Sequence, residues 1–428
     1  MYKMKFVILS GAYKNAGDFL IVDRSIQLLR HVYPDCSVQI YERRFSLEEN
    51  LDEINQSDAL ILAGGPVYSP SIYPNEIPLT ADLSRIQIPI YTLGLGWFGG
   101  DSTDQLLYRQ YIFTPRTREL LSRLEQDGPL TCRDWYSVRA LKNNGFTRTV
   151  MTGCPAWYDL DHVRQISLRD GFRFPYRKIC ISDPTNPGNI PQSMELVRFI
   201  RKKYPEAKLV YVFHRGIRAD AMTSEKVGAQ YEALAHWLEQ MGVDTQDISY
   251  SQDGFAVYND CDLHVGMRVH AHIYNLSIRN VSVLIEEDGR GAGVNEALGL
   301  FGIKAYQNGA VPFSARRSIP ARLMRFFFRK LCGPRKGNPY LLHRLDDYLF
   351  MLESSGYQMI TAAFSVQQIY FENMLSHISQ FEKRDGRLPE SGERPLSGEG
   401  RTGLQGAGGS HEDISSDPGT GWVEGDTQ

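Results

Sequence analysis

The chain has 428 residues, which is more than one hydrophobic core usually serves, so we expect two domains. Its 47 basic and 50 acidic side chains give a net charge of −3, and this balance gives no general reason to expect nucleic-acid binding. We expect no amino-terminal signal sequence, and no apolar run approaches the roughly 20 residues that cross a bilayer.

The six cysteines are dispersed along the chain and form no CxxC pair. This spacing favours reduced thiols over a disulfide framework or a zinc site. No cluster with the spacing of metal ligands is recognisable, so we expect chemistry without a metal. These features predict a cytosolic protein.

Apolar runs that end in glycine or another small residue recur through the first 160 residues. The first run, Lys5–Leu9, leads through a glycine-containing loop into a helix over about 19–32, with Asp18 as its N-cap. Because the carboxyl ends of parallel strands gather at one edge of a sheet, the loops after these strands should form one site. Further strands are expected at 38–41, 59–65, 90–96, 130–134 and 150–156, and helices at 115–126 and 137–143.

The same pattern restarts after a more polar passage, 162–177, which we interpret as a connection between domains. Strands are expected at 179–182 and 208–213, and helices at 192–203 and 229–240. The repetition predicts an α/β protein with two Rossmann-like domains facing a cleft. We place the domains at 1–160 and 161–310.

The most informative stretch runs from Asp260 to Asn275. It is typical of a short strand at 263–265, a glycine turn at Gly266 and a helix opened by Arg268. A second apolar run at 281–285 completes a βαβ unit, whose ligands bind at the carboxyl ends of the strands. An arginine, three histidines and a helix amino terminus at that end predict a site for a small, strongly anionic ligand.

Two interpretations of Arg268 are open. Its planar fork of donors can bind a carboxylate or a phosphate. His270 faces the same ligand only if the helix begins at this point, whereas His272 shares the helical face of Arg268. In the alternative, Arg268 pairs with Asp260 or Asp262, and the histidines are ordinary partly buried residues.

Several motifs between residues 5 and 290 resemble those of the polysaccharide pyruvyl transferases. They are Gly11 with Asn15-Ala-Gly-Asp18, Ala63-Gly-Gly65, Leu93-Gly-Leu-Gly96, Cys132-Arg-Asp with Ser137 and Leu141, Gly153-Cys-Pro155, and Asp262 with Arg268-Val-His270. The resemblance implies a fold similar to that of the GT-B glycosyltransferases. Pro66 departs from the pattern, because the family more often has a third glycine there, and the segment after Phe301 has no counterpart.

The resemblance also implies an activity, the transfer of the enolpyruvyl group of phosphoenolpyruvate to a sugar of a polysaccharide or lipid-linked glycan. The product is a pyruvate ketal, and phosphoenolpyruvate is a substrate, so no cofactor is implied. Arg268 would bind the donor, and His270 would be a phosphate ligand or proton donor. His214, Arg215 and Gly266 are expected to be further donor contacts.

The loops of the first domain are expected to hold the acceptor. By analogy with two-domain transferases of this shape, the residues nearest the sugar would be Asn15, Asp18, Gly65 and Trp97. Asp18 or Asp134 would serve as the catalytic base, and both count as candidate acceptor contacts. Trp97 would stack on a pyranose or, equally, fill the domain interface as an aromatic plug.

The chain changes character after about residue 310, where 311–382 is expected to form a basic, amphipathic helical segment. Residues 315–336 carry eight basic and no acidic side chains, with apolar residues interleaved. Such a helix either lies on anionic lipid at the inner face of a membrane or packs its apolar side on the core. We expect 342–381 to be a helical arm across both domains and 383–428 to be a disordered tail.

Two further functions stay open from the sequence. One is a glycosyltransferase of the same architecture that uses a nucleotide sugar. The other is a catalytically silent member of the family that is attached to membranes through 315–336. Stabilisation by a nucleoside diphosphate would favour the first, and ligand or lipid binding without turnover would favour the second.

Overall fold

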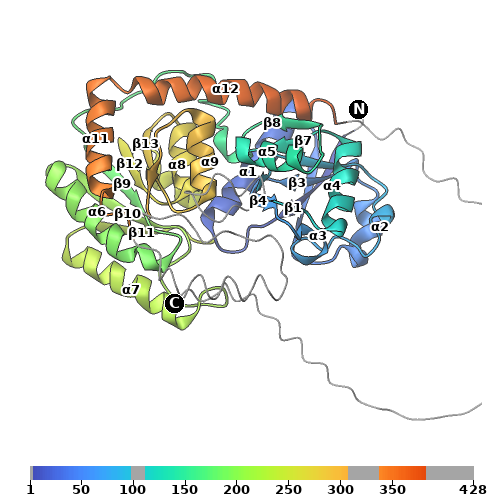
Figure 1. Ribbon diagram of the computed structural model, residues 1–428, viewed down its shortest axis with the longest axis horizontal. Helices are drawn as coiled ribbons and strands as arrows, with labels where there is room; N and C mark the ends of the chain where they lie inside the picture. Colours follow the sequence, from blue (N-terminus) through green and yellow to red (C-terminus); the bar gives the residue numbers. More distant parts are fainter. Residues whose placement is uncertain (1–2, 98–110, 307–336, 382–428) are drawn as a thin grey trace, which may run out of the picture. The chain divides into compact units, whose positions relative to one another are not determined.

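A computed structural model describes residues 3–97, 111–306 and 337–381 (Figure 1). These residues form two main parallel sheets, one from each predicted half of the chain, followed by two long helices. The basic segment 315–336 and the tail 383–428 lie outside the described residues. Contacts join residues 1–383 into one compact unit, so the predicted boundary near residue 160 stays a prediction.

The first sheet has the strand order β2-β1-β3-β5, and all its pairs are parallel. Its inner strands are almost fully buried, because helices and loops cover both faces of a parallel sheet. A backbone hydrogen bond of 3.1 Å from Leu95 to Thr131 links the end of β5 to β7, which pairs with β8. The strands of this half are β1 Lys5–Ser10, β2 Ser37–Glu42, β3 Ala59–Ala63, β4 Pro66–Tyr68, β5 Ile90–Leu93, β6 Gly96–Trp97, β7 Leu130–Cys132 and β8 Thr149–Met151. Its helices are α1 Ala16–Val32, α2 Leu51–Ile54, α3 Ile72–Asn75, α4 Pro115–Asp127 and α5 Trp135–Asn143.

The second sheet has the order β11-β10-β9-β12-β13-β14, again with parallel pairs. The crossovers place β9 and β12 side by side in the middle, so the loops after these two strands adjoin each other. The strands are β9 Lys178–Ser182, β10 Lys208–Phe213, β11 Asp244–Asp247, β12 Leu263–Gly266, β13 Val281–Glu286 and β14 Ile303–Lys304. The helices are α6 Ile190–Lys203, α7 Glu225–Gln240, α8 Val269–Ser277 and α9 Gly289–Leu298. The predicted pair of Rossmann-like α/β domains is confirmed by these two sheets.

The prediction that Asp18 caps the first helix is wrong. Helix α1 begins at Ala16, with Asn15 at the N-cap position, so Asp18 lies in the first turn. The backbone N–H of Asp18 already bonds to the carbonyl of Asn15 at 3.0 Å, which closes the turn three residues earlier than predicted. The side-chain amide of Asn15 donates to Asp18 Oδ2 at 3.1 Å and fixes that carboxylate.

The predicted C-terminal arm is two helices, α11 (Leu341–Ser354) and α12 (Gln358–Ile378), drawn in orange to red in Figure 1. The break falls where Gly356 and Tyr357 both have positive φ, of 61° and 63°, a conformation that ends a helix. Helix α12 contacts α1 of the first half and α9 of the second, as the prediction of an arm across both halves requires. No helix within the described ranges is long and apolar enough to cross a bilayer.

Buried His377 anchors α12 to the first sheet. It is 3% exposed, and its Nε2 lies 2.9 Å from the carbonyl oxygen of Thr92. Burial lowers the pKa of His377 to about 4, against the opposing effect of that hydrogen bond. The ring is therefore neutral in the folded protein at neutral pH.

We expect His377 to make folding stability depend on pH. An unfolded histidine titrates near pH 6.5, so as the pH falls below about 6.5 the unfolded chain takes up a proton that the folded chain refuses. At about pH 5.5 this uptake should lower the free energy of unfolding by about 1.4 kcal/mol relative to its value at about pH 7.5. His377→Gln keeps an N–H donor for Thr92 but does not titrate, so its loss of stability between these pH values should be smaller by that amount. The measurement is equilibrium urea unfolding at both pH values.

The matched control is His343→Gln on α11, because the side chain of His343 is 75% exposed. This variant should keep the full pH dependence of the wild type. An equal pH dependence in His377→Gln and in the wild type would contradict the assignment.

Candidate functional site

Loops of the two halves meet where α1 and α8 begin. The backbone N–H of Ala16 donates to the carbonyl of His214 at 3.1 Å, and Lys14 Nζ lies 2.6 Å from Asp220 Oδ2. The ring of His270 packs so closely on Gly17 that a Cβ at position 17 would lie 2.0 Å from its Nδ1. Glycine at position 17 therefore lets the start of α1 approach the start of α8.

Arg268 is the N-cap residue of α8 and is bound on one side by Asp183. Its Nε lies 2.8 Å from Asp183 Oδ1 and its Nη2 lies 2.5 Å from Oδ2, while Nη2 also donates to the carbonyl of Pro184 at 3.0 Å. Only Nη1 is left to a weak contact, 3.4 Å from the hydroxyl of Thr185. Whether Arg268 contacts a donor stays a prediction.

The alternative partners of Arg268 are wrong. Asp260 binds Lys178, and Asp262 binds Arg169 at 2.9 Å. Asp262 also accepts the backbone N–H of Arg177 at 2.8 Å, so it serves the start of β9, at the opposite end of the strands from the site. Asp183 was missed because it follows β9, 85 residues before Arg268 in the chain.

Of the three histidines in this stretch, His270 alone lies among the site arginines. His264 bonds to Ser182 and Ser282 at 3.0 and 2.8 Å, and His272 bonds to Ser282 at 2.7 Å. Burial lowers the pKa of His272 to about 3, so this ring is a neutral part of the core. These two residues have a structural role, as the alternative predicted, but both are fully buried rather than partly buried.

The Nε2 atom of His270 is buried and has no hydrogen-bond partner among the described residues. Burial lowers the pKa of His270 to about 4; the charge of Asp18 opposes this, and the charges of Arg133, Arg290 and Arg268 reinforce it. His270 is therefore neutral near pH 7 and surrounded mostly by positive charge. Asp18 and His270, predicted as catalytic residues, are brought within electrostatic reach of each other.

Arg133 is a site residue that the predictions missed. It follows β7, is 2% exposed and lies against Gly96, where a Cβ would be 2.1 Å from its Nε. Nε is 3.4 Å from Asp134, and Nη2 is buried with no hydrogen-bond partner in the described part of the chain. An unsatisfied buried donor costs on the order of 1–3 kcal/mol, so this nitrogen is suited to an acceptor supplied by a ligand. The Cys132-Arg-Asp motif was the available signal.

Arg290 was also missed, because the glycine-rich start of α9 runs against helix propensity and no helix was predicted there. Its Nε and Nη2 bind the N-cap Asp288 at 2.9 and 2.5 Å. The charge of Arg290 acts on His270, which places it at the same site. Asp288 offsets much of this charge.

Asp134 and Trp97 lie inside the first half. Asp134 is fully buried and caps α5, accepting the N–H and hydroxyl of Ser137 at 2.7 and 2.8 Å. Burial raises its pKa, while Arg133 and the bonds from Ser137 oppose the rise. Trp97 is 1% exposed, with the rings of Tyr111 and Tyr136 each 5.7 Å away. Trp97 therefore fills the interior of this half, and it leaves no ring face open for a sugar.

The remaining predicted contacts lie at strand ends around the same place. His214 is buried, bonds through Nε2 to Tyr258 at 2.8 Å, and has a pKa lowered well below its usual value by burial and by Arg268. Arg215 follows it in the chain. A Cβ at Gly266 would lie 2.2 Å from the hydroxyl of Ser182, so this glycine makes room for the neighbouring strand rather than forming the predicted turn.

Gly65 has φ +76°, and its carbonyl accepts the N–H of Gly96 at 2.8 Å. Asn15 and Asp18 lie at the start of α1, as described above. The expected contacts of Asn15, Asp18 and Gly65 with an acceptor stay predictions. Within the described ranges, no three His, Cys, Asp or Glu side chains come together as metal ligands.

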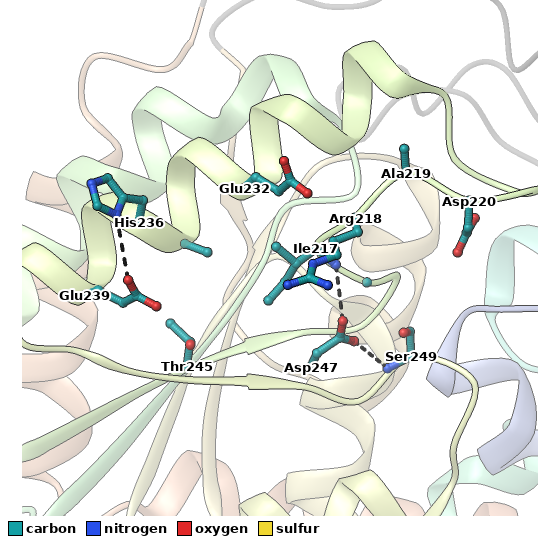
Figure 2. Close-up of a pocket in the computed structure, with 12 residues that line it drawn as sticks. Ile217, Arg218, Ala219, Asp220, Glu232, His236, Glu239, Thr245, Asp247 and Ser249 are labelled. Atoms are coloured by element: carbon teal, nitrogen blue, oxygen red, sulfur yellow. Dashed lines mark hydrogen bonds and ion pairs between the residues drawn. The ribbon is translucent and has the colours of Figure 1, made fainter.

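A separate cavity of about 640 Å³ lies between α7, the loop after β10 and the end of β11 (Figure 2). Asp247 at its floor accepts the N–H groups of Ile217 and Ser249 at 3.2 and 2.9 Å. The lining residues with ionisable side chains are Arg218, Asp220, Glu232, His236, Glu239 and Asp247. The excess of carboxylates makes this cavity unsuited to an anionic ligand, unlike the arginine-rich site at His270.

The sequence of the chain was compared with protein families and with curated proteins. The chain matches the family described as polysaccharide pyruvyl transferase over residues 15–274, which span the loops of both halves. No curated protein sequence matches the chain.

Solved structures similar to this chain share little sequence with it. S. aureus MnaA, in a co-structure with UDP, is 12% identical with a TM-score of 0.46, over 88% of this chain and 96% of its own. The UDP-GlcNAc 2-epimerase of Methanocaldococcus jannaschii is 10% identical with a TM-score of 0.41, over 82% and 100%. A mutant of the Thermobaculum terrenum O-GlcNAc transferase is 13% identical with a TM-score of 0.35, over 88% and 68%.

The contact between Gly17 and His270 gives a prediction for stability. Gly17→Ala should destabilise the protein by about 1–3 kcal/mol, because the new methyl group overlaps the imidazole. In a His270→Ala background the overlap is gone, so the same substitution should cost little. Urea unfolding of the wild type, both single variants and the double variant measures this coupling. An equal cost of Gly17→Ala in both backgrounds would show that the ring does not occupy this place.

Proposed function

Because the chain belongs to the polysaccharide pyruvyl transferase family, we propose that it transfers the enolpyruvyl group of phosphoenolpyruvate to a sugar of a glycan and so forms a pyruvate ketal. One observation carries the proposal beyond the family. Among the described residues, Nη2 of Arg133 and Nε2 of His270 are buried without a hydrogen-bond partner, and the charge of Arg133 acts on His270. The site thus offers a guanidinium with one unused donor beside a neutral imidazole that is able to receive a proton.

Phosphoenolpyruvate carries a carboxylate and a phosphate, so it needs more than one positive subsite. Arg133 supplies a guanidinium whose Nη2 is free. Arg268 contributes only Nη1, since Nε and Nη2 bind Asp183. The amino terminus of α8 adds backbone N–H groups and a favourable helix dipole.

In the proposed reaction, His270 protonates the methylene carbon of the donor. The carbon that bears the phosphate becomes oxocarbenium-like, and a sugar hydroxyl adds to it while Asp18 takes the hydroxyl proton. Phosphate then leaves with the C–O bond electrons, and a second hydroxyl of the acceptor closes the ketal, its proton passing to the phosphate. Asn15 supports this role of Asp18 by holding its carboxylate at 3.1 Å.

We expect phosphoenolpyruvate to raise the melting temperature of the protein. A ligand at about 100 times its dissociation constant adds about 2.7 kcal/mol of stability. The shift should disappear in Arg133→Ala and persist in Arg164→Ala, a control whose side chain is 71% exposed. UDP, GDP and CMP serve as competing ligands in the same assay. A shift with a nucleotide and none with phosphoenolpyruvate would instead favour a glycosyltransferase.

Binding of the donor should also protonate His270. Its pKa of about 4 leaves it neutral before binding, and a bound phosphate dianion raises that pKa. At about pH 7.5, above the second phosphate pKa of about 6, the complex should therefore take up part of one proton. Calorimetric titration in buffers of different ionisation enthalpy measures this uptake. His270→Gln should bind phosphoenolpyruvate without the uptake, and unchanged uptake in this variant would exclude His270 as the acid.

A further inference from the structure

A second arginine whose guanidinium has unused donors, as far as the described residues show, lies outside the donor contacts, at the carboxyl edge of the first sheet. Arg43 follows the edge strand β2, and its backbone N–H donates to the carbonyl of Ser10 at 2.9 Å. Its half-buried side chain then runs across the ends of β1 and β3. A Cβ at Gly11 would lie 2.6 Å from its Cζ, and a Cβ at Gly65 would lie 3.3 Å from its Nη1.

The two glycines keep the path of this side chain clear. Each follows a different strand, Gly11 after β1 and Gly65 after β3, and each lacks the side chain that would meet the guanidinium. Gly65 also has φ +76°, which disfavours any other residue there. The guanidinium of Arg43 therefore lies against both glycines at the carboxyl edge of the sheet, on a side chain that is partly exposed.

Arg43 differs from the arginine beside it in having no counter-ion. Arg44 binds Glu42 at 2.8 Å and lies over the ring of Tyr13 at 4.3 Å. Over the residues that the structure describes, the guanidinium of Arg43 makes neither a hydrogen bond nor an ion pair. The Arg43 guanidinium lies against Gly11 and Gly65 and has unused donors, so it is suited to bind an anion.

Arg43 and Arg133 lie on different sides of one pair of glycines. The carbonyl of Gly65, next to Arg43, accepts the N–H of Gly96, and Gly96 lies against Arg133. In the proposed function, the donor's two anionic groups are matched by Arg133, Nη1 of Arg268 and the start of α8. Arg43 therefore falls on the part of the edge where the acceptor is expected.

We propose that Arg43 binds an anionic group of the acceptor, a phosphate or a carboxylate, so that the acceptor of this protein is a charged glycan. That the bound molecule is the acceptor rests on the proposed function. The presence of an anion site at Arg43 does not. A sugar phosphate and a uronic acid are the two sources of such a group. Either would form charge-assisted hydrogen bonds with the free guanidinium.

The test uses full-length protein saturated with phosphoenolpyruvate, so that charged probes cannot occupy the donor subsites. The probes are glucose 1-phosphate, glucuronic acid and uncharged glucose, titrated by calorimetry or ligand-observed NMR. At least one charged probe should bind about tenfold or more tightly than glucose, and Arg43→Gln should remove that advantage. The charged probe that binds more tightly than glucose shows whether the group recognised is a phosphate or a carboxylate.

The adjacent Arg44→Gln is the matched control and should bind all probes as the wild type does. Gly11→Ala is a second test, because its methyl group would displace the guanidinium and should weaken the charged probe without removing a charge. The melting shift with phosphoenolpyruvate should be unchanged in Arg43→Gln. Loss of that shift would assign Arg43 to the donor and overturn the inference.

Charged probes that bind no better than glucose, or equally well to Arg43→Gln, would also overturn it. Failure of the proposed function looks different. Phosphoenolpyruvate would then give no shift in any form of the protein, while the charged probe would still depend on Arg43.

Discussion

The buried ion pair between Arg268 and Asp183 is the interaction on which the site depends. One carboxylate accepts both Nε and Nη2 of Arg268 and also the backbone N–H of His214 at 3.1 Å, so it ties the loops after β9, β10 and β12 to one another. A buried pair recovers its desolvation cost only when its remaining donors are also satisfied, and the carbonyl of Pro184 provides for this. Because the pair fixes where α8 begins, it also fixes the first turn from which His270 reaches Gly17.

The arginines of the site divide into two kinds. Arg268 and Arg290 are each bound by a carboxylate through two nitrogens, so their first task is to hold the backbone of α8 and α9 in place. Arg133 and Arg43 have donors with no acceptor in the part of the chain that the structure describes, and both lie against glycines in the first half. The carboxylate-bound arginines hold the backbone in place, whereas Arg133 and Arg43 have donors left to bind a ligand. An unsatisfied charge lowers the stability of the empty protein, and an anionic ligand would restore that stability.

The sequence predicted where the loops of the candidate site meet, but it did not predict most of the contacts within the site. Glycines after successive strands and the Arg268-Val-His270 motif predicted where the loops converge, because strand order and side-chain charge are local properties. The partner of Arg268 was beyond such reasoning, since Asp183 comes near only through the pairing of β9 with β12. Trp97 was placed near the acceptor by analogy with two-domain transferases, although its burial depends on packing against Tyr111 and Tyr136. The free nitrogen of Arg133 is visible only once the surrounding side chains are in place.

The neutral state of His270 connects binding with chemistry in the proposed reaction. Burial and three arginines keep the proton off the ring at neutral pH, so the empty site holds no ready acid. A dianion that enters the site offsets the arginines and favours the charged imidazolium. The acid would therefore form only when the donor is bound, next to the carbon that it must protonate. In the proposed reaction, Arg133 and Arg268 would bind phosphoenolpyruvate and would also set the condition under which His270 can act.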